Sequence, residues 1–283
     1  MTTTAPSAHP IAFDYHSHHF RCGHAVGEMR EYIEAARQLG MHTFGVSDHA
    51  PAFWLPGDDA NPGTQMAKSE LPCYLSEARQ LQAEYAGKID VRVGMEADYI
   101  DLREYELFPF LEANEFDYLL GSVHYTRGVN VFKRDRWQTE NAEDTYTDYY
   151  RQVVLAARTG LFDILSHLTV VEAYGPPITP TLAERLYNET ADAVAEAGCV
   201  VEINTSGYRK MEGDEPFPNR AMLRCLIARK VPLTFGSDSH QPAQVGWERD
   251  RVCGLLLELG VDPAKGAVPI TVRRGPVWAF QTG

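Results

Sequence analysis

Short apolar runs alternate with helix-like stretches along the chain, and this alternation most constrains the fold. Seven runs have the composition of strands, at residues 11–18, 43–49, 91–99, 118–125, 162–168, 199–207 and 232–240. Between and after them lie stretches that favour helices, at residues 27–39, 74–86, 143–159, 179–197, 219–229 and 247–259. A repeated strand-then-helix order predicts parallel βα units, and 283 residues are enough for one α/β barrel.

Side chains that can bind metals stand where these runs end. Six of the seven strand candidates end in histidine, glutamate or aspartate, and one further histidine lies in a loop. The nine candidates are His16, His18, His24, His49, Glu96, His124, His167, Asp238 and His240. Imidazole and carboxylate are ligands for zinc, iron and manganese, and nine groups exceed the ~4 to 6 positions around one ion. Because the carboxyl ends of barrel strands meet on one face, the pattern predicts a cluster of metals there.

The spacing within the motifs indicates how ligands could share ions. His16 and His18 are two residues apart on a strand end, so both point to the same side of the pleat. Asp238 and His240 repeat this spacing and could face the same ion or a neighbouring one. Glu96 could bridge two ions through its two oxygens.

Three neighbours of the candidate histidines could act indirectly. Asp48 precedes His49, and Ser166 precedes His167. His19 follows directly on another candidate histidine. Such groups can orient the imidazole rings instead of binding a metal themselves.

A metal cluster of this kind suits the hydrolysis of a phosphate ester. The ions lower the pKa of bound water towards ~7 and clamp the phosphoryl oxygens as charge develops. The attacking hydroxide would most naturally bridge two ions. A cationic side chain should complete the phosphate site, and the candidates are Arg209, Lys210, Arg127, Lys133 and Arg134. Arg209 is favoured because its planar fork can bind two phosphate oxygens, whereas Lys133, Arg134 and Arg136 fit a solvated loop face better.

Other features of the sequence exclude competing functions. The GxSxG, GxxxxGK[ST] and GxGxxG motifs are absent, so a seryl intermediate, a phosphate loop and a dinucleotide turn find no support. A net charge of -13 disfavours non-specific binding to nucleic acid. The five cysteines are scattered, and we therefore expect a cytoplasmic enzyme. The chain has no run of ~18 apolar residues, so no membrane span is predicted, and the polar start predicts a loose tail at residues 1–10.

The motifs DYHSHHFRCGHA, SDHAP, GMEADY, GSVHY, ILSHL and FGSDSH, taken in this order, resemble the polymerase-and-histidinol-phosphatase (PHP) superfamily. The resemblance covers nearly the whole chain. It implies an α/β fold, a distorted (β/α)7 TIM-like barrel over residues 11–283, with three divalent metal ions that could be zinc, iron or manganese. By the same resemblance, the first ion would bind His16, His18, Glu96 and Asp238; the second, Glu96, His124 and His167; and the third, His24, His49 and His240.

Within the superfamily, the segment EINTSGYRK and the other motifs look like the histidinol-phosphate phosphatase branch. The branch implies hydrolysis of L-histidinol phosphate, with Glu96, Asp238 and His240 in catalysis and a phosphate-binding Arg209. Lys210 and Arg127 are further candidates for substrate contact. The basic loop 126–142 departs from the branch, which usually carries an aromatic and acidic loop there. Alternatives are a phosphoesterase for another small phosphate ester or nucleotide, and a non-catalytic metal-binding module that supports a partner. The oligomeric state stays open.

Overall fold

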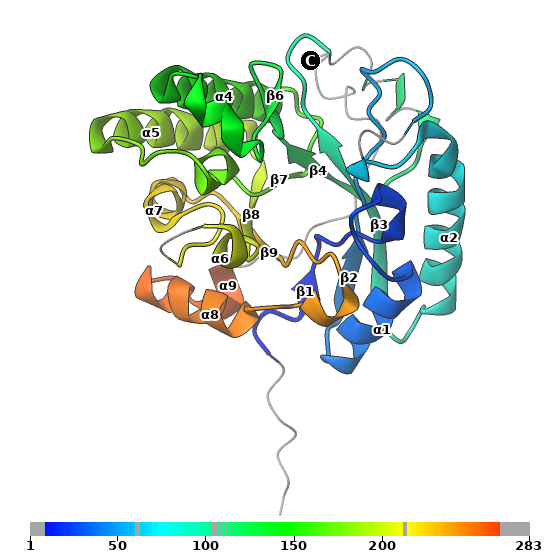
Figure 1. The fold of residues 1–283 in the computed structure, drawn as a ribbon. Helices are drawn as coiled ribbons and strands as arrows, with labels where there is room; N and C mark the ends of the chain where they lie inside the picture. The colour runs from blue at the N-terminus through cyan, green and yellow to red at the C-terminus, as the bar shows by residue number, and fades with distance from the viewer. Residues whose placement is uncertain are drawn as a thin grey trace, which may run out of the picture.

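Seven parallel strands form the centre of the molecule, and helices surround them (Figure 1). The computed structural model describes residues 9–59, 63–103, 107, 109–110, 113–211 and 214–266. The strands pair in the order β1-β2-β3-β4-β7-β8-β9, so each lies beside the next barrel strand along the chain. Their bounds are β1 Phe13–Asp14, β2 Thr43–Val46, β3 Asp90–Asp98, β4 Tyr118–Ser122, β7 Ile164–Leu165, β8 Val200–Asn204 and β9 Leu233–Gly236.

The first and last strands close the sheet into a barrel. The amide of Tyr15 donates to the carbonyl of Phe235 at 3.3 Å, and that of His18 donates to the carbonyl of Ser239 at 2.8 Å. Ser17 and Ser239 form a parallel bridge. Because β1 contributes only two residues to a regular ladder, the seam rests on these few bonds. The predicted distorted (β/α)7 barrel is therefore confirmed, and its distortion lies between β1 and β9.

In the part of the chain that the structure describes, six long helices follow the strands, close to where the sequence predicts them. They are α1 Met29–Gln38, α2 Leu71–Glu84, α4 Ala142–Arg158, α5 Pro180–Ala197, α7 Arg220–Ala228 and α8 Arg249–Glu258, with two single turns, α6 Gly207–Lys210 and α9 Pro263–Gly266. The Thr179 side chain caps α5 by accepting from the amide of Leu182, and Gly198 ends it with a left-handed φ of 70°. Helix α2 begins three residues earlier than predicted, because Pro72 fits the first turn of a helix.

The two long segments expected as loops contain regular structure. The first, 53–73, ends in the 3-10 turn Lys68–Glu70 and the start of α2. The second, 126–142, carries most of a hairpin of β5 Tyr125–Thr126 and β6 Val129–Asn130, followed by the 3-10 turn Arg134–Gln138. The basic segment is thus a folded unit at the end of β4.

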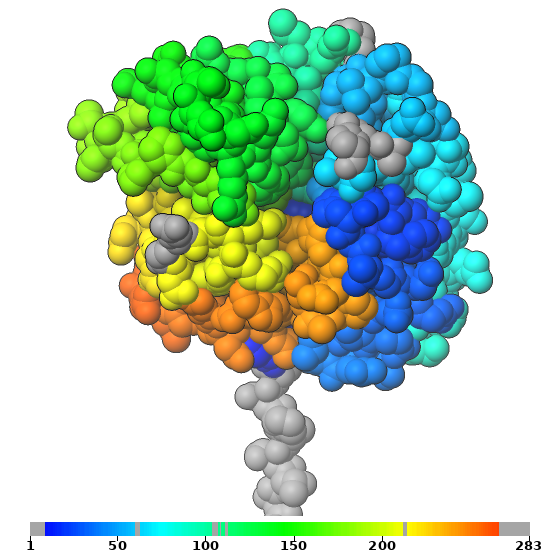
Figure 2. Space-filling view, in the orientation of Figure 1, coloured from blue at the N-terminus to red at the C-terminus, as the bar shows by residue number. Residues whose placement is uncertain are grey.

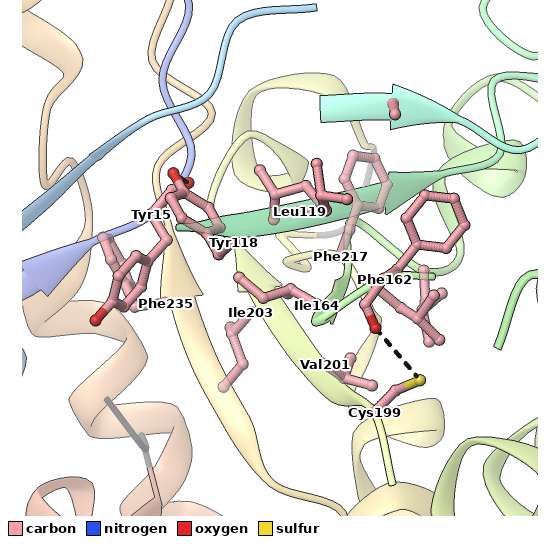
Figure 3. Packing of buried hydrophobic residues seen from close by; sticks show 14 of the residues in the cluster. Tyr15, Tyr118, Leu119, Phe162, Ile164, Cys199, Val201, Ile203, Phe217 and Phe235 are labelled. Carbon is pink, nitrogen blue, oxygen red and sulfur yellow. Dashed lines mark hydrogen bonds between the residues drawn. The ribbon is translucent and has the colours of Figure 1, made fainter. Parts of the chain in front are cut away.

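Buried aromatic and aliphatic side chains pack against the barrel strands (Figure 3). Tyr15, Tyr118 and Phe235 lie together there, and the Tyr118 hydroxyl donates to the Tyr15 carbonyl at 2.6 Å. A Cβ atom at Gly94 would overlap the Tyr118 ring, so only glycine lets β3 pass this ring. This apolar layer forms the floor below the polar end of the barrel.

The structure does not describe the two ends of the chain. Of the expected tail 1–10, residues 1–8 lie outside the described residues, as do residues 267–283 at the other end. A single domain over 11–283 therefore stays a prediction. Across the described residues, no helix has both the length and the apolar character needed to cross a membrane.

Candidate metal centre

The nine predicted ligands meet at the C-terminal end of the barrel. Most of them line one small recess of about 50 Å³, which we call the central recess. On the space-filling face, the blue N-terminal, green, yellow and orange segments come together around this end (Figure 2). The recess is lined by His24, His49, Glu96, His124, His167, Asp238 and His240, with Phe132 and Lys210.

His16 and His18 form the buried side of the cluster together with Asp238. The Nε2 atom of His18 lies 3.1 Å from Oδ1 of Asp238, and Nε2 of His16 lies 3.8 Å from the same oxygen. Glu96 approaches both rings, with Oε1 3.5 Å from Nε2 of His16 and Oε2 3.6 Å from Nε2 of His18. These four groups can converge on a single ion.

His124 and His167 form a second group on the other side of Glu96. Their Nε2 atoms lie 3.2 Å apart. The Glu96 Oε1 atom lies 2.8 Å from Nε2 of His167 and 3.6 Å from Nε2 of His124. Glu96 therefore stands between two sets of histidines, as a bridging carboxylate must.

His24 and His240 form a third group, with their Nε2 atoms 2.9 Å apart. His49, which the resemblance places with them, points its Nδ1 atom at Oε2 of Glu96, at 2.7 Å. The His49 and His240 ring centroids are 6.4 Å apart, whereas those of His49 and His18 are 4.1 Å apart. His49 thus lies between the groups and contacts the bridge directly.

The ring nitrogens fit metal ions better than they fit one another. The Nδ1 atoms of His24 and His240 face the carbonyls of Cys22 and Asp238 at 3.4 and 3.0 Å, so the protons belong on Nδ1. The two Nε2 lone pairs then face each other and repel unless a cation lies between them. Nitrogens about 3 Å apart match neighbouring ligands on an ion with bonds of ~2.1 Å.

Buried atoms without hydrogen bonds support the same conclusion. Among the described residues, Nε2 of His16 is buried and makes no hydrogen bond. Nε2 of His18 and Oε2 of Glu96 are buried close to Asp238 and His49, but neither contact has the geometry of a hydrogen bond. Such atoms cost free energy unless another partner binds them. Metal ions would be that partner.

Carboxylates and carbonyls behind the rings hold them in place. With its proton on Nδ1, His16 donates to Oε1 of Glu202 at 2.7 Å, and His124 donates to Oδ1 of Asp98 at 2.9 Å. This leaves the Nε2 lone pair of each ring aimed at the cluster. Such contacts fix the tautomer and strengthen the ring as a ligand.

Asp48 supports two rings as well. It lies 3.4 Å from Nδ1 of His18 and 2.8 Å from Nδ1 of His19. The structure therefore places Asp48 behind His18 and His19 and not behind the ring of its sequence neighbour His49. Ser166 contacts Nε2 of His167 at 3.3 Å.

The buried carboxylates keep their negative charge. Burial alone would raise the pKa of Glu96, but His49, His16 and His124 hold it well below the usual range. Burial opposes ionisation of Asp238 too, and Lys210 and His16 keep its pKa well below the ordinary value. Buried negative charge of this density needs compensating cations, which divalent metals supply.

Backbone strain occurs at two candidate ligands. His167 has a φ of 27° and Asp238 a φ of 51°, both in the left-handed region. Residues other than glycine adopt this region at a cost of ~1 to 3 kcal/mol, and they concentrate at functional sites. The strain aims both side chains into the cluster.

Lys210 approaches the cluster more closely than Arg209 does. The Nζ atom of Lys210 lies 3.1 Å from Oδ2 of Asp238 and sits over the Phe132 ring at 5.0 Å. Arg209 reaches the backbone carbonyls of Ser237 and Asp238 at 3.5 and 3.3 Å, and it borders an adjoining cavity. Lys210 therefore lies beside the candidate metal ligands, and Arg209 lies at the rim.

The other basic residues of the segment 126–142 lie farther from the metal ligands or are buried. Arg127 lies exposed in the turn of the β5–β6 hairpin, where its amide donates to Asp148. Lys133 is exposed and is 3.8 Å from Asp135. The expectation of a solvated face was wrong for Arg136, which is only 3% exposed.

Arg136 is buried because it ties the basic segment together. It pairs with Glu140 at 2.7 Å and donates to the carbonyls of Val129 and Thr126. Arg134 alone of the three faces a cavity, over the ring of Tyr174 at 4.1 Å.

Sequence reasoning missed Glu202 and Asp98. Glu202 is an acid inside the apolar run VVEIN, and Asp98 follows Glu96 by two residues on the same strand. An acid in a buried strand and an acid at spacing two were the available signals.

Comparisons with known proteins agree with this geometry. The profile of the PHP domain family matches residues 14–206. A protein of Deinococcus radiodurans named "Probable histidinol-phosphatase" is 37% identical over 83% of this chain and 88% of its own length. The histidinol-phosphatase of Bacillus subtilis is 30% identical over 83% of this chain and 95% of its own.

A solved structure shares the fold. The histidinol phosphate phosphatase of Lactococcus lactis, complexed with zinc, L-histidinol and phosphate, has a TM-score of 0.74 at 22% identity. The alignment covers 92% of this chain and 96% of that one. The chain belongs to the PHP domain family. Within that family, the relatives described above bear the name histidinol-phosphatase.

Proposed function

We propose that the protein is a metal-dependent phosphomonoesterase that hydrolyses L-histidinol phosphate to L-histidinol and phosphate. The observation that carries the activity is the convergence of nine ligand groups, Glu96 among them, with Lys210 beside them. The identity of 37% to a histidinol-phosphatase relative supports the substrate. The complete ligand set argues against a non-catalytic module.

We infer that the cluster holds three ions, with Glu96 shared between two of them. His16, His18 and Asp238 would serve the first ion, His124 and His167 the second, and His24 and His240 the third. His49 could complete the third set after a rotation away from Glu96, which it contacts at 2.7 Å. Histidine and carboxylate ligands admit zinc, iron and manganese.

When bound, the ions would supply a water of lowered pKa and neutralise charge on the phosphoryl oxygens. The chain itself contributes orientation and charge. Glu202 and Asp98 fix two ligand rings, and Lys210 adds a cation at the phosphoryl position. Arg209 lies at the rim, where its fork can bind phosphate oxygens. Arg127, in its exposed turn, has the weakest support as a substrate contact.

Phosphate release with and without metal tests the proposal. Protein stripped by a chelator and reloaded separately with zinc, iron or manganese should hydrolyse L-histidinol phosphate, and stripped protein should not. A panel of nucleotides assayed in parallel distinguishes the alternative phosphoesterase. Faster cleavage of nucleotides would refute the proposed substrate. If no phosphate ester were cleaved with any of the metals, the proposal that the protein is a phosphomonoesterase would be refuted.

A further inference from the structure

A cavity of about 650 Å³ adjoins the central recess, and of its lining residues only Arg209 and Lys210 have a role in the hydrolysis described above. Its walls are Arg134 after β4, the segment 172–178 after β7, and the segment 209–211 after β8. Lys210 lines both spaces, so the cavity opens beside the metal ligands. Its size is in the range of small-molecule sites, ~300–1,000 Å³.

Arg134 and Arg209 present unpaired charge to this cavity. The Arg134 guanidinium lies 4.1 Å from the centroid of the Tyr174 ring, and that of Arg209 lies 4.7 Å from the Trp247 ring. Within the described ranges, neither guanidinium has a carboxylate at ion-pair distance, although the chain holds 39 acidic residues. A ring covers only the flat face of a guanidinium, so N–H groups at its edge can bind an anion. Arg209 uses only its Nη2 atom on the carbonyls of Ser237 and Asp238.

The charge on the cavity wall is predominantly positive. Arg134, Arg209 and Lys210 are cationic, and Glu172 is the single carboxylate among the described lining residues. The Glu172 oxygens accept hydrogen bonds from two buried tyrosines and from the amide of Asn219. Burial raises the pKa of Glu172 to about 7, so part of its charge is absent near neutral pH. The balance favours an anion.

We propose that this cavity is an anion subsite, and that the protein also hydrolyses small phosphate monoesters that carry a carboxylate or a second phosphate. The inference rests on the proposed phosphomonoesterase activity. The ester phosphate lies at the metal centre beside Lys210, and the second anion binds Arg134. The reaction is the same hydrolysis: the oxygen of water bonds to phosphorus, the ester P–O bond breaks, and the leaving alcohol gains a proton. L-Histidinol phosphate carries no second anion, so the subsite widens the substrate range.

Two substrates that differ only by a carboxylate test the subsite. O-Phospho-L-serine and O-phosphoethanolamine share the phosphate and the ammonium group, and only the first has the second anion. With metal-loaded wild-type protein, kcat/KM should favour phosphoserine by about tenfold, as a charged hydrogen-bonded pair allows. Arg134→Ala should remove most of this preference and leave the rate on phosphoethanolamine unchanged.

Lys133→Ala is the matched control, because Lys133 is the adjacent exposed cation and lies near Asp135. It should keep the preference. The inference is overturned if wild-type protein shows no preference for phosphoserine. It is also overturned if Arg134→Ala slows both substrates equally, because Arg134 would then act on the transferred phosphoryl group.

Binding of phosphonate analogues separates this inference from the proposed function. In the analogues, CH2 replaces the ester oxygen of each probe, so binding is read by calorimetry without turnover. The analogue with the carboxylate should bind wild-type protein about tenfold more tightly than it binds the Arg134→Ala variant. Equal binding would refute the subsite even if L-histidinol phosphate were hydrolysed. If the analogue bound the Arg134→Ala variant more weakly but L-histidinol phosphate were not hydrolysed, only the proposed substrate would be refuted.

Discussion

Replacing Glu202 with glutamine should disturb two metal ligands at once. Oε1 of Glu202 accepts from Nδ1 of His16 at 2.7 Å, and Oε2 accepts from the amide of His167 at 3.0 Å and the side chain of Asn204 at 2.8 Å. Glutamine has the same shape but only one acceptor oxygen. In either orientation, its NH2 group therefore meets a donor. If it faces His16, that ring must move its proton to Nε2, the atom aimed at the metals.

The expected loss follows from these contacts. Removing a carboxylate behind a metal-binding histidine costs ~10- to 100-fold in metal affinity. A buried donor left unpaired costs ~1–3 kcal/mol in the free energy of unfolding. Titration of stripped protein with zinc against a chromophoric chelator measures the first, and urea unfolding without metal measures the second.

Glu196→Gln is the matched control, because it makes the same charge change at an exposed position of α5. Its metal affinity should equal that of wild-type protein. Wild-type affinity in Glu202→Gln, or an equal loss in both variants, would refute the role of Glu202 in orienting the ligands.

Three further changes have defined outcomes. Arg209→Ala should raise KM for L-histidinol phosphate about tenfold with metal content intact, and unchanged kinetics would remove Arg209 from the site. Because burial raises the pKa of Glu172 from 4.5 to about 7, the folded state binds its proton more tightly, and the free energy of unfolding should fall by up to ~3 kcal/mol as pH rises through this interval. Glu172→Gln should flatten that dependence in urea titrations of metal-free protein, and an unchanged slope would exclude Glu172 as its source. Gly236→Ala places a Cβ against Oε1 of Glu202. It should lower the free energy of unfolding in urea by ~1–3 kcal/mol and reduce the metal content. Wild-type stability and metal content would contradict this prediction.

The barrel and the location of its site were predictable because both depend on local pattern. Strand ends in βα units share one face of a barrel, so residues as distant as His18 and Asp238 could be placed together before their contact was known. Helix ends followed from single residues such as Thr179 and Gly198. These signals act within a few residues of the chain.

Contacts between distant strands were harder to predict. Side-chain direction at the recess places His49 on Glu96 and brings Lys210 nearer to the ligands than Arg209. The support from Glu202 depends on β8 lying beside β9, where Gly236 has no Cβ and so leaves room for the Glu202 carboxylate. No local pattern encodes such packing.

The number of metal ions per chain tests the central claim most directly. Elemental analysis of protein purified without chelators should give about three divalent ions per chain, because the nine ligand groups form three sets, with Glu96 shared between two of them. Glu96→Gln removes a carboxylate that faces two ligand groups, so it should lose about two ions together with phosphatase activity. A single ion in wild-type protein, or a full complement with normal turnover in Glu96→Gln, would contradict the shared bridge.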